Sequence, residues 1–282
     1  MLRLAVRVRR EDADLVLAEL LELAPSGVEE SDLEGGAVVE YAVYGAPGEL
    51  PDLPDVQAAV GGALVEVVTT EVADDWADRW RAFHRPIEIA GRLYVRPPWE
   101  PAADGLLDLV IDPGQAFGTG AHHTTRLCLE LLAEEPPPGD GAAAGAGAVM
   151  DLGCGSGVLA IAAARLGWGP VAGVDHELES VRATAENARA NGVEVAVERF
   201  DLIRGGPAPT APLVLANLLR PLLLCVARAG FAGGAVPDTL IASGLLSPEA
   251  DEIAAAFARH GLVEAARRES AEWAALVLRS SH

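Results

Sequence analysis

Lysine is absent from this sequence. All 21 basic residues are arginine, and 42 acidic residues give the chain a formal net charge of −21. Proteins that bind the phosphate backbone of nucleic acids carry basic surfaces, so we expect no direct DNA binding. An acidic field would instead steer a basic substrate towards the protein. The acidity is equally typical of a general compositional bias towards arginine, alanine, glycine and proline, and both explanations stay open at this point.

Cysteine is scarce, and long apolar runs are missing. The three cysteines, Cys128, Cys154 and Cys225, form neither a C-x-x-C pair nor a metal-ligand pattern, and an odd number cannot pair completely. Reduced thiols are typical of cytosolic proteins, so we expect a cytoplasmic chain without a metal site. No apolar run approaches the roughly 20 residues of a membrane-spanning helix. The first residues indicate a strand and a charged helix rather than a signal peptide, so no membrane partner is expected.

The length of the chain allows two domains. It has 282 residues, half of them hydrophobic, which is enough for a small domain and a sizeable α/β core. Alternating and helical spacings in the first 72 residues predict the order β-α-β-β-α-β of a ferredoxin-like α+β domain. The expected strands are 2–8, 27–33, 37–43 and 64–70, and the expected helices are 11–23 and 55–60.

A connector helix is expected at residues 73–86. Trp76 and Trp80 lie one helical turn apart with Phe83 beside them, a stripe typical of a helix that docks on a domain. The alternative is an aromatic platform for a substrate. Farther along, residues 134–147 are rich in proline, glycine and alanine, and this composition predicts a flexible surface insertion.

The remainder of the chain predicts a Rossmann-like α/β domain. Strands and helices alternate beyond residue 148, which indicates a doubly wound, mostly parallel sheet. Two final strands without a helix between them predict a hairpin that makes the last strand antiparallel. The expected strands are 87–89, 92–96, 106–111, 148–152, 170–175, 193–197, 212–217, 238–243, 263–269 and 273–278, and the expected helices are 125–132, 156–167, 177–191, 219–230 and 248–259.

The most informative segment is D-L-G-C-G-S-G at residues 151–157. It lies between an apolar strand and a helix, so it predicts a tight glycine loop at a helix N-terminus. Gly153 and Gly155 allow the backbone to approach a bound cofactor, towards which the helix directs its partial positive charge. Asp175 ends the next strand, where a carboxylate can accept two hydrogen bonds from a ribose diol.

Two classes of nucleotide cofactor use such a loop. The dinucleotide fingerprint G-x-G-x-x-G/A needs a small third residue, and Val158 occupies that position here. Asp151 precedes the loop and would repel a pyrophosphate, whereas it suits a cofactor with an amino-acid end. These residues favour S-adenosylmethionine over a dinucleotide. The remaining alternative is a loop that only turns the chain.

A second glycine-rich segment, residues 111–125, leads into a helix. Thr124 or Thr125 suits the cap of that helix. The segment has the composition of a mobile lid over a cofactor, and Phe117 suits a contact with a sulfonium cation. An ordinary loop with capping threonines explains the composition equally well, and two adjacent histidines without a third ligand are weak evidence for a metal.

Asn217 is the polar residue at the end of the expected strand 212–217. Ligands in such sheets bind at the carboxyl ends of the strands, so Asn217 would lie beside the transferred methyl group. Its carbonyl oxygen would accept a hydrogen bond from an incoming amine. Capping of the following helix is an alternative that is compatible with this role.

Three motifs together closely resemble the methyltransferases of large-subunit ribosomal protein eleven, the PrmA family. They are D-P-G-x-A-F-G-T-G-x-H-x-T-T at 112–125, D-L-G-C-G-S-G at 151–157 and N-L-L at 217–219. The resemblance covers nearly the whole chain, although the insertion at 134–147 is longer than is usual in the family. It implies S-adenosylmethionine-dependent methylation of lysine ε-amines and of the N-terminal α-amine of the ribosomal protein.

The resemblance also implies roles for regions and residues. It implies a substrate-recognition domain at 1–72, a connector at 73–86 and a cofactor-binding catalytic domain at 87–282. By match to the family, the cofactor contacts are Thr125, Gly153, Asp175 and Asn217, and Asn217 is also the catalytic residue. The lid and the glycine loop add five expected contacts, which are Phe117, Gly118, Thr119, Asp151 and Gly155.

The expected reaction is an in-line displacement in which an amine nitrogen attacks the methyl carbon. No residue has to act as a general base, and His122 is only a weak candidate for that role. Three other functions fit parts of the sequence: a methyltransferase of another protein's lysines or of a small amine, a non-catalytic ribosome-assembly factor, and a dinucleotide oxidoreductase. The first of these shares the whole catalytic domain, so only the N-terminal domain distinguishes it.

Overall fold

A computed structural model provides the structure of the chain. It describes residues 2–13, 16, 17, 20, 28–33, 37–45, 50, 64–71, 85–113, 122–139, 143 and 145–281. The chain divides into two compact units, Met1–Phe83 and His84–His282. The division falls in the expected connector region. Residues 73–84 of that region, with the three aromatic residues of its stripe, lie outside the described residues.

Four antiparallel strands form the sheet of the first unit. They are β1 (Leu2–Arg9), β2 (Glu29–Leu33), β3 (Val38–Gly45) and β4 (Leu64–Glu71), and a 3-10 turn, η1 (Arg10–Asp12), follows β1. The sheet order is β2-β3-β1-β4 with every neighbouring pair antiparallel, as in a ferredoxin-like domain. The second predicted helix, 55–60, lies outside the described residues.

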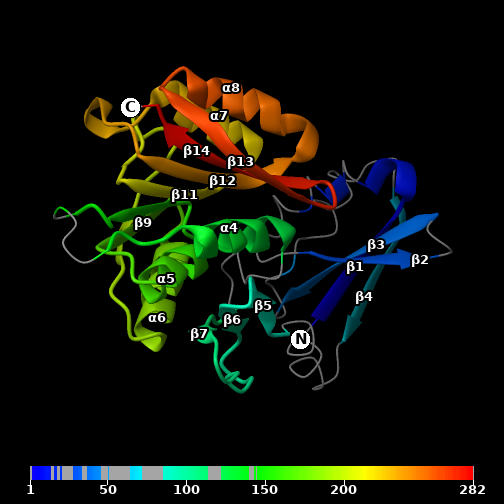
Figure 1. Ribbon diagram of the computed structural model, residues 1–282. Helices are drawn as coiled ribbons and strands as arrows, with labels where there is room; N and C mark the ends of the chain where they lie inside the picture. The colour runs from blue at the N-terminus through cyan, green and yellow to red at the C-terminus, as the bar shows by residue number, and fades with distance from the viewer. Residues whose placement is uncertain are drawn as a thin grey trace. The chain divides into compact units, whose positions relative to one another are not determined.

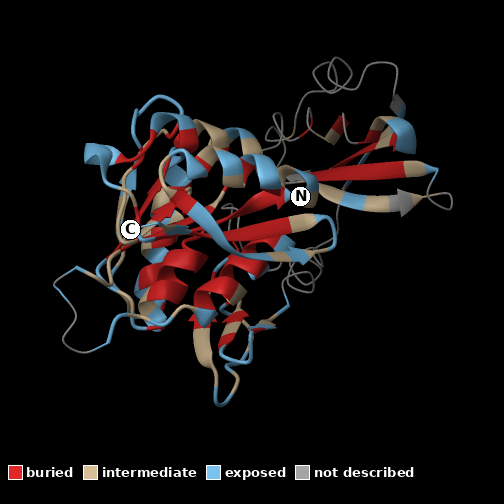
Figure 2. Ribbon diagram, turned by 45° about the horizontal axis from the view of Figure 1, so that its top comes forward, coloured by how far each residue is buried: buried red, intermediate tan, exposed pale blue. Residues whose placement is uncertain are grey.

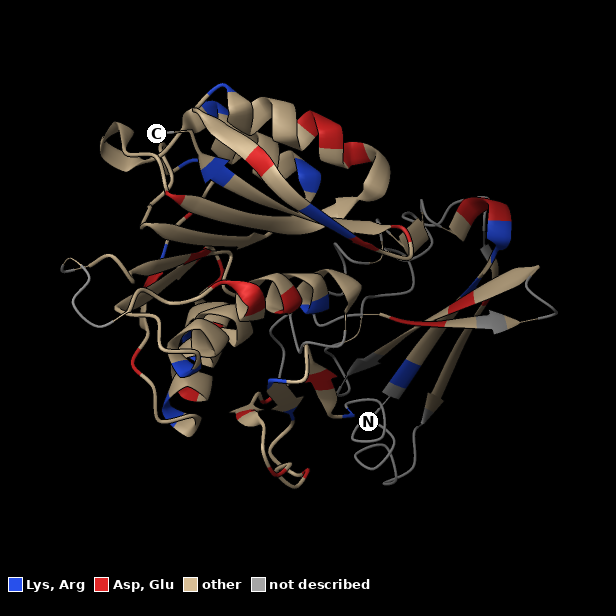
Figure 3. Cartoon of the chain, in the orientation of Figure 1, with Lys and Arg blue, Asp and Glu red and all other residues tan. Residues whose placement is uncertain are grey.

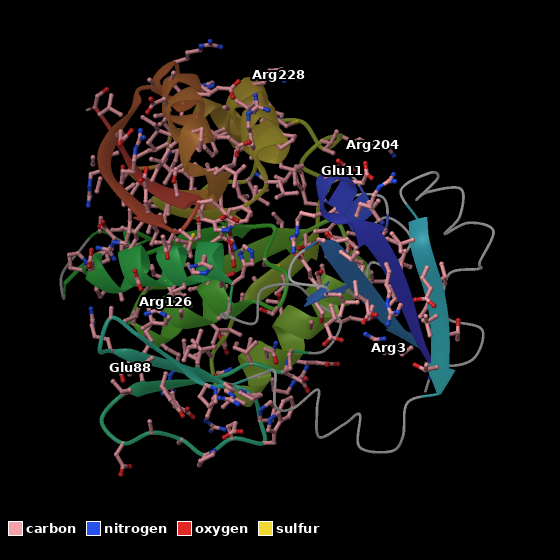
Figure 4. All side chains as sticks on the ribbon, turned by 90° about the vertical axis from the view of Figure 1, so that its right-hand side faces the viewer. Arg3, Glu11, Glu88, Arg126, Arg204 and Arg228 are labelled. Atoms are coloured by element: carbon pink, nitrogen blue, oxygen red, sulfur yellow. The ribbon has the colours of Figure 1, made fainter. Side chains whose placement is uncertain are left out.

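The two faces of this sheet differ in chemistry. On one face Glu40 is only 6% exposed and accepts hydrogen bonds from Arg3 Nη2 at 2.5 Å and Arg7 Nε at 2.7 Å. Figure 4 labels Arg3 on its strand. Burial alone would raise the pKa of Glu40, but the two arginines outweigh it and lower that pKa. The other face carries the apolar core, which includes Val6, Val8, Val16, Leu20 and Tyr41.

A seven-stranded sheet organises the second unit. Its order is β10-β9-β8-β11-β12-β14-β13, and β14 is antiparallel to both of its neighbours. The strands from β8 to β12 are parallel to one another, which confirms the predicted α/β class and the antiparallel last strand. The strands are β8 (Val149–Leu152), β9 (Val171–Asp175), β10 (Ala196–Arg199), β11 (Leu213–Asn217), β12 (Thr239–Leu246), β13 (Leu262–Ser270) and β14 (Trp273–Ser280).

Helices cover both faces of this sheet (Figure 1). Alternate residues of a strand point to opposite faces, so Leu213 and Leu215 of β11 join one core while Val214 and Ala216 join the other. Figure 2 shows the buried strands between the helices. The first core contains α4 (His123–Glu134), α5 (Val158–Arg165) and part of α6 (Leu178–Ala190), and the second contains α7 (Arg220–Ala229) and α8 (Ala250–Ala258).

Three short strands lead into the large sheet. β5 (Ile87–Ile89) pairs antiparallel with β6 (Leu93–Arg96), which pairs parallel with β7 (Leu107–Val110). Buried Ile89, Leu93 and Leu109 belong to the same core as α4 and α5. This small sheet therefore adds to one apolar core of the second unit.

Ion pairs fasten α4 to the last two strands. Arg268 Nη2 lies 2.9 Å from Glu134 Oε1, and Arg279 Nη2 lies 2.7 Å from Glu135 Oε1. Arg126 on the exposed side of α4, labelled in Figure 4, donates from Nε to Glu130 Oε1 at 3.0 Å. Basic and acidic positions are consequently interspersed on α4 and β13 (Figure 3).

Several predicted boundaries were wrong; β12, for example, ends at Leu246 rather than at residue 243. β10 begins at Ala196 rather than at residue 193, because Val193 and Val195 pack against the core from the segment that follows α6 and do not pair as a strand. Helix α4 begins at His123 rather than at residue 125. The described residues 135–139 and 143, within the predicted insertion, form neither helix nor strand.

Candidate active site at the carboxyl edge of the sheet

The glycine loop connects β8 to α5 in the predicted place. Gly153, Gly155 and Gly157 have φ angles of +73°, +53° and +82°, a region that disfavours residues with a Cβ. Gly153 N donates to Val174 O at 2.8 Å and so ties the loop to the end of β9. The backbone N–H groups of the loop and of the first turn of α5 therefore meet at the carboxyl edge of the sheet.

Neighbouring side chains also leave no space for a Cβ at two of these glycines. A Cβ on Gly153 would lie 2.5 Å from Leu218 Cδ2, and a Cβ on Gly157 would lie 2.7 Å from Thr184 Cγ2. From the sequence, Gly153 was expected to let the backbone approach a cofactor. The structure adds close packing of the loop against the residue that follows Asn217.

Asp175 ends β9 and is held in place by backbone donors. It is 8% exposed, and its Oδ2 accepts from Gly155 N at 3.0 Å while its Oδ1 accepts from Glu177 N at 3.0 Å. Nδ1 of the exposed His176 lies 3.4 Å from Oδ1. An ionised carboxylate has about four acceptor positions, so capacity remains for the hydroxyl groups of a ribose.

Asp151 lies deeper than Asp175. It is 1% exposed, and its Oδ2 accepts from Ala160 N in α5 at 3.2 Å. Its Oδ1 is buried and has no hydrogen-bond partner among the described residues. Burial raises the pKa of Asp151 to about 7. The hydrogen bond from Ala160 lowers the pKa, but this effect is smaller than that of burial. A bound cation that paired with Oδ1 would favour the ionised form.

Asn217 and Thr125 are brought together from different elements. Asn217 Nδ2 donates to Thr125 Oγ1 at 3.1 Å, although 92 positions separate the two residues in the sequence. Thr125 is fully buried on α4. This bond fixes the amide, and Asn217 Oδ1 is then buried with no hydrogen-bond partner among the described residues. An unpaired buried acceptor costs free energy, so its presence indicates a donor that arrives with a ligand.

The structure corrects two capping predictions. The N-cap of α4 is His122, whose Nδ1 accepts from Thr124 N at 3.3 Å, so neither Thr124 nor Thr125 is the cap. The N-cap of α7 is Leu219, and Asn217 makes no capping hydrogen bond. The amide of Asn217 binds Thr125 instead, which leaves its carbonyl oxygen for another partner.

His122 is poorly suited to act as a general base. Its Nδ1 accepts from Thr124 N and lies 2.8 Å from Thr124 Oγ1, so this nitrogen is already engaged. Burial, with a smaller effect from His123, lowers the pKa of His122. The imidazole is therefore neutral near pH 7, with its proton on Nε2.

The model of the family described as ribosomal protein L11 methyltransferase (PrmA) matches residues 52–281. The chain belongs to this family. It is 35% identical to a protein named ribosomal protein L11 methyltransferase from Burkholderia ambifaria, with 91% of each chain aligned. It is 39% identical to one from Pelotomaculum thermopropionicum, over 78% of this chain and 70% of that relative.

A solved structure agrees with this membership. The crystal structure titled ribosomal protein L11 methylase from Lactobacillus delbrueckii subsp. bulgaricus superposes with a TM-score of 0.56 at 26% identity. The match covers 71% of this chain and all of that one. Membership in the family makes the chain a methyltransferase, and the oxidoreductase alternative is excluded.

The lid motif stays a prediction. Phe117, Gly118 and Thr119 lie within residues 114–121, which are outside the described residues. Among the residues that are described, no group of three side chains is arranged to hold a metal ion. No helix in the described parts of the chain is long and apolar enough to cross a membrane.

Polar residues in α6 and at its C-cap support the site in this methyltransferase, and they were not predicted from the sequence. Thr184 Oγ1 donates to Gly155 O at 2.8 Å, and Asn187 Nδ2 donates to Ser156 O at 2.9 Å. Asn191 Nδ2 donates to Val110 O at 2.7 Å, which ties β7 to the same helix. Their spacing of three and four residues on an otherwise solvated helix was the available signal.

Gly244 offers a test of how the site is packed. It has a φ of +86°, and a Cβ there would lie 2.4 Å from Leu218 O. Gly244→Ala should lower the free energy of unfolding by about 2–5 kcal/mol, because the costs of backbone strain and of overpacking are added together. It should also reduce methyl transfer, because the segment that carries Asn217 must move. Urea denaturation and activity assays would measure both effects.

Gly192→Ala is the matched control for that variant. Gly192 has a similar φ of +64°, but a Cβ there would have no neighbour within 4 Å. Only backbone strain of about 1–2 kcal/mol is expected. Equal losses of stability in the two variants would show that contact with Leu218 does not constrain the loop after β12.

Proposed function

We propose that this chain transfers methyl groups from S-adenosylmethionine to amine nitrogens of ribosomal protein L11, both lysine ε-amines and the N-terminal α-amine. The observation that supports this proposal is Asn217 Oδ1, at the carboxyl end of β11. This acceptor is buried and has no hydrogen-bond partner among the described residues. It lies beside the glycine loop, because Leu218 packs on Gly153. An acceptor there suits a donor N–H on an incoming amine.

The residues of the site fit S-adenosylmethionine. Gly153 and Gly155 would let the backbone approach the ligand, and Asp175 would accept from the ribose hydroxyls. Oδ1 of Asp151, which has no hydrogen-bond partner within the described part of the chain, would receive the cationic amino-acid end. Thr125 would act indirectly, because its hydroxyl holds the amide of Asn217 in place. When bound, this cofactor supplies a methyl group on a sulfonium sulfur that departs as a neutral thioether.

The protein's task in the reaction is alignment of a neutral amine. A lysine amine has a reference pKa of about 10.4, so it must lose its proton before it can attack. Asn217 Oδ1 would accept one N–H and direct the nitrogen lone pair towards the methyl carbon. His122 Nδ1 is engaged by Thr124, so we expect water rather than this histidine to take the proton. Orientation of the reactants then supplies much of the rate enhancement.

The substrate assignment follows the names of the relatives. Proteins aligned over 91% of this chain are named for ribosomal protein L11, and the formal charge of −21 suits an approach by a lysine-bearing protein. A ribosomal substrate would place the activity in the cytoplasm, and the first unit is the candidate for substrate recognition.

Purified protein, S-adenosylmethionine with a labelled methyl group and recombinant L11 would test this function. Label should enter L11, and peptide mass spectrometry should locate it on amine nitrogens. Other purified ribosomal proteins and a lysine-rich cell extract serve as controls. Transfer to those controls at the same rate as to L11 would replace the L11 assignment with a broader amine methyltransferase.

Asp175→Ala tests the proposed ribose contact. The variant should bind S-adenosylmethionine about 10–100-fold more weakly, which is about 1.4–2.8 kcal/mol by calorimetry. Asp104→Ala, which removes an exposed carboxylate distant in sequence, is the control and should bind normally. Wild-type affinity in Asp175→Ala, with the fold intact by circular dichroism, would refute the assignment.

A further inference from the structure

Apolar side chains are exposed around Asn217, at the edge where a substrate amine must arrive. Leu219 is 64% exposed and Leu246 is 38% exposed, although most large apolar residues of this unit are buried. Trp273 is partly buried and packs against the core that contains α4. His122 is also partly buried. These four residues, His122, Leu219, Leu246 and Trp273, are called the amine rim below.

Strand register places the members of the amine rim together. Asn217 is opposite Ser243 in the β11–β12 pair, and Leu246 is opposite Trp273 in the β12–β14 pair. Leu218 N donates to Ser243 O at 3.0 Å, so the segment that carries Leu219 lies along the end of β12. All of these positions are at the carboxyl edge of the parallel strands.

The N-terminus of α4 closes the other side of the amine rim. The rings of His122 and Trp273 meet edge to face, with centroids 5.0 Å apart and planes at 70°. His123 Nδ1 lies 3.0 Å from Ser270 Oγ, so α4 also contacts the hairpin next to Trp273. Figure 1 shows the turn between β13 and β14 beside one end of α4. Because α4 also carries Thr125, the same helix positions both Asn217 and the ring pair.

The electrostatics of the amine rim favour a cationic or neutral amine. Neutral His122 adds no positive charge there. The cation nearest in sequence, Arg220, is paired with Glu252 at 2.6 Å and lies 4.0 Å from Glu249. The face of an aromatic ring attracts methylated ammonium groups.

Repeated methylation changes which contacts the target nitrogen can make with the enzyme. In each transfer the nitrogen lone pair forms the N–C bond, the C–S bond breaks, and its electron pair stays on sulfur. The methylammonium product then loses a proton to water before the next transfer. Each step replaces an N–H with a methyl group, so Asn217 has fewer donors to accept from. A neutral lysine amine that carries two methyl groups has no N–H left. Apolar and aromatic contacts must then replace the lost hydrogen bonds.

We propose that the amine rim holds the aliphatic stem of the target lysine and its methylated nitrogen, and that Trp273 determines how many methyl groups that nitrogen receives. The proposal rests on the proposed amine methyltransferase function. Trp273 is a specificity-determining residue for the later transfers, whereas Asn217 serves mainly the first one.

The test compares two tryptophan variants. Trp168 and Trp273 are both partly buried and pack against the same core, but Trp168 precedes β9, at the opposite edge of the sheet. Trp273→Leu and Trp168→Leu therefore remove the same side chain from contact with the same core. Time courses of mono-, di- and trimethylated L11 peptides by mass spectrometry give the rate of each transfer, and thermal melts report stability.

Trp273→Leu should lower the ratio of the second to the first transfer rate by about fivefold, which corresponds to ~1 kcal/mol. Trp168→Leu should leave that ratio unchanged even if it melts at a lower temperature. Trp273→Phe keeps an aromatic face and should recover most of the ratio, and it provides the measurement if the leucine variant does not fold.

Four outcomes separate this inference from the function on which it rests. Equal loss of both rates in Trp273→Leu, or the same change in Trp168→Leu, would overturn the role of Trp273. Wild-type protein that adds a single methyl group to each amine would also overturn it while leaving the methyltransferase function intact. Wild-type protein that transfers no methyl group to any amine would overturn the proposed function itself.

Discussion

Asn217→Ala should lower kcat for methyl transfer by at least about 100-fold, the magnitude seen when one preorganised group is removed from a reacting centre. The substitution removes the buried Oδ1 acceptor that would orient the amine and also breaks the hydrogen bond to Thr125. Cofactor affinity should change by less than about tenfold, because Asp175 and the glycine loop are unaffected. Single-turnover kinetics and calorimetry would separate the two effects.

Two companion variants show which part of the amide matters. Asn217→Asp keeps an oxygen at the same position, and the hydroxyl of Thr125 can donate to it, so part of the rate should survive. Thr125→Val removes the anchor of the amide and leaves Oδ1 in place, so a loss of about tenfold is expected. Near-normal turnover in Asn217→Ala would refute a role for Asn217 at the reacting centre.

Asp151→Asn should abolish a pH dependence of cofactor binding. Burial raises the pKa of Asp151 to about 7, so in the ligand-free protein the group is largely protonated at pH 6 and largely ionised at pH 8. If the cationic end of S-adenosylmethionine pairs with the carboxylate, affinity in the wild type should increase by up to about tenfold over that interval. The asparagine variant should bind more weakly with a flat pH profile. Calorimetry in buffers of different ionisation enthalpy would also detect the proton released on binding.

The same group makes a prediction about stability. A carboxyl whose pKa is higher in the folded state than in the unfolded chain stabilises the fold fully below the unfolded value of 3.8, and this contribution is lost as the pH rises through about 7. The ligand-free wild type should therefore be more stable at pH 5 than at pH 8, by about 2–3 kcal/mol. In Asp151→Asn, the free energy of unfolding should not show this decrease with pH. Parallel pH profiles for the two proteins would show that Asp151 ionises normally in the folded state.

Local patterns were sufficient for the order of elements in the second unit. Glycine spacing at 153, 155 and 157 predicted the turn into α5, and the acid at the end of an apolar run predicted where β9 ends. The prediction failed at β10, because Val193 and Val195 have the composition of a strand but are used as packing residues. It also failed at the start of α4, where the capping group is a histidine ring rather than a threonine.

The sequence alone determined the fold class, the family and the residues whose chemistry suits a methyl donor, because glycine turns, alternation and strand-end polar residues are encoded over a few neighbouring positions. Only the tertiary structure decided how those residues meet. The bond from Asn217 to Thr125 joins positions 92 residues apart, and the ring pair of His122 and Trp273 joins a helix cap to a hairpin. Such contacts depend on strand order and register, which arise when distant segments bury their apolar faces against one another.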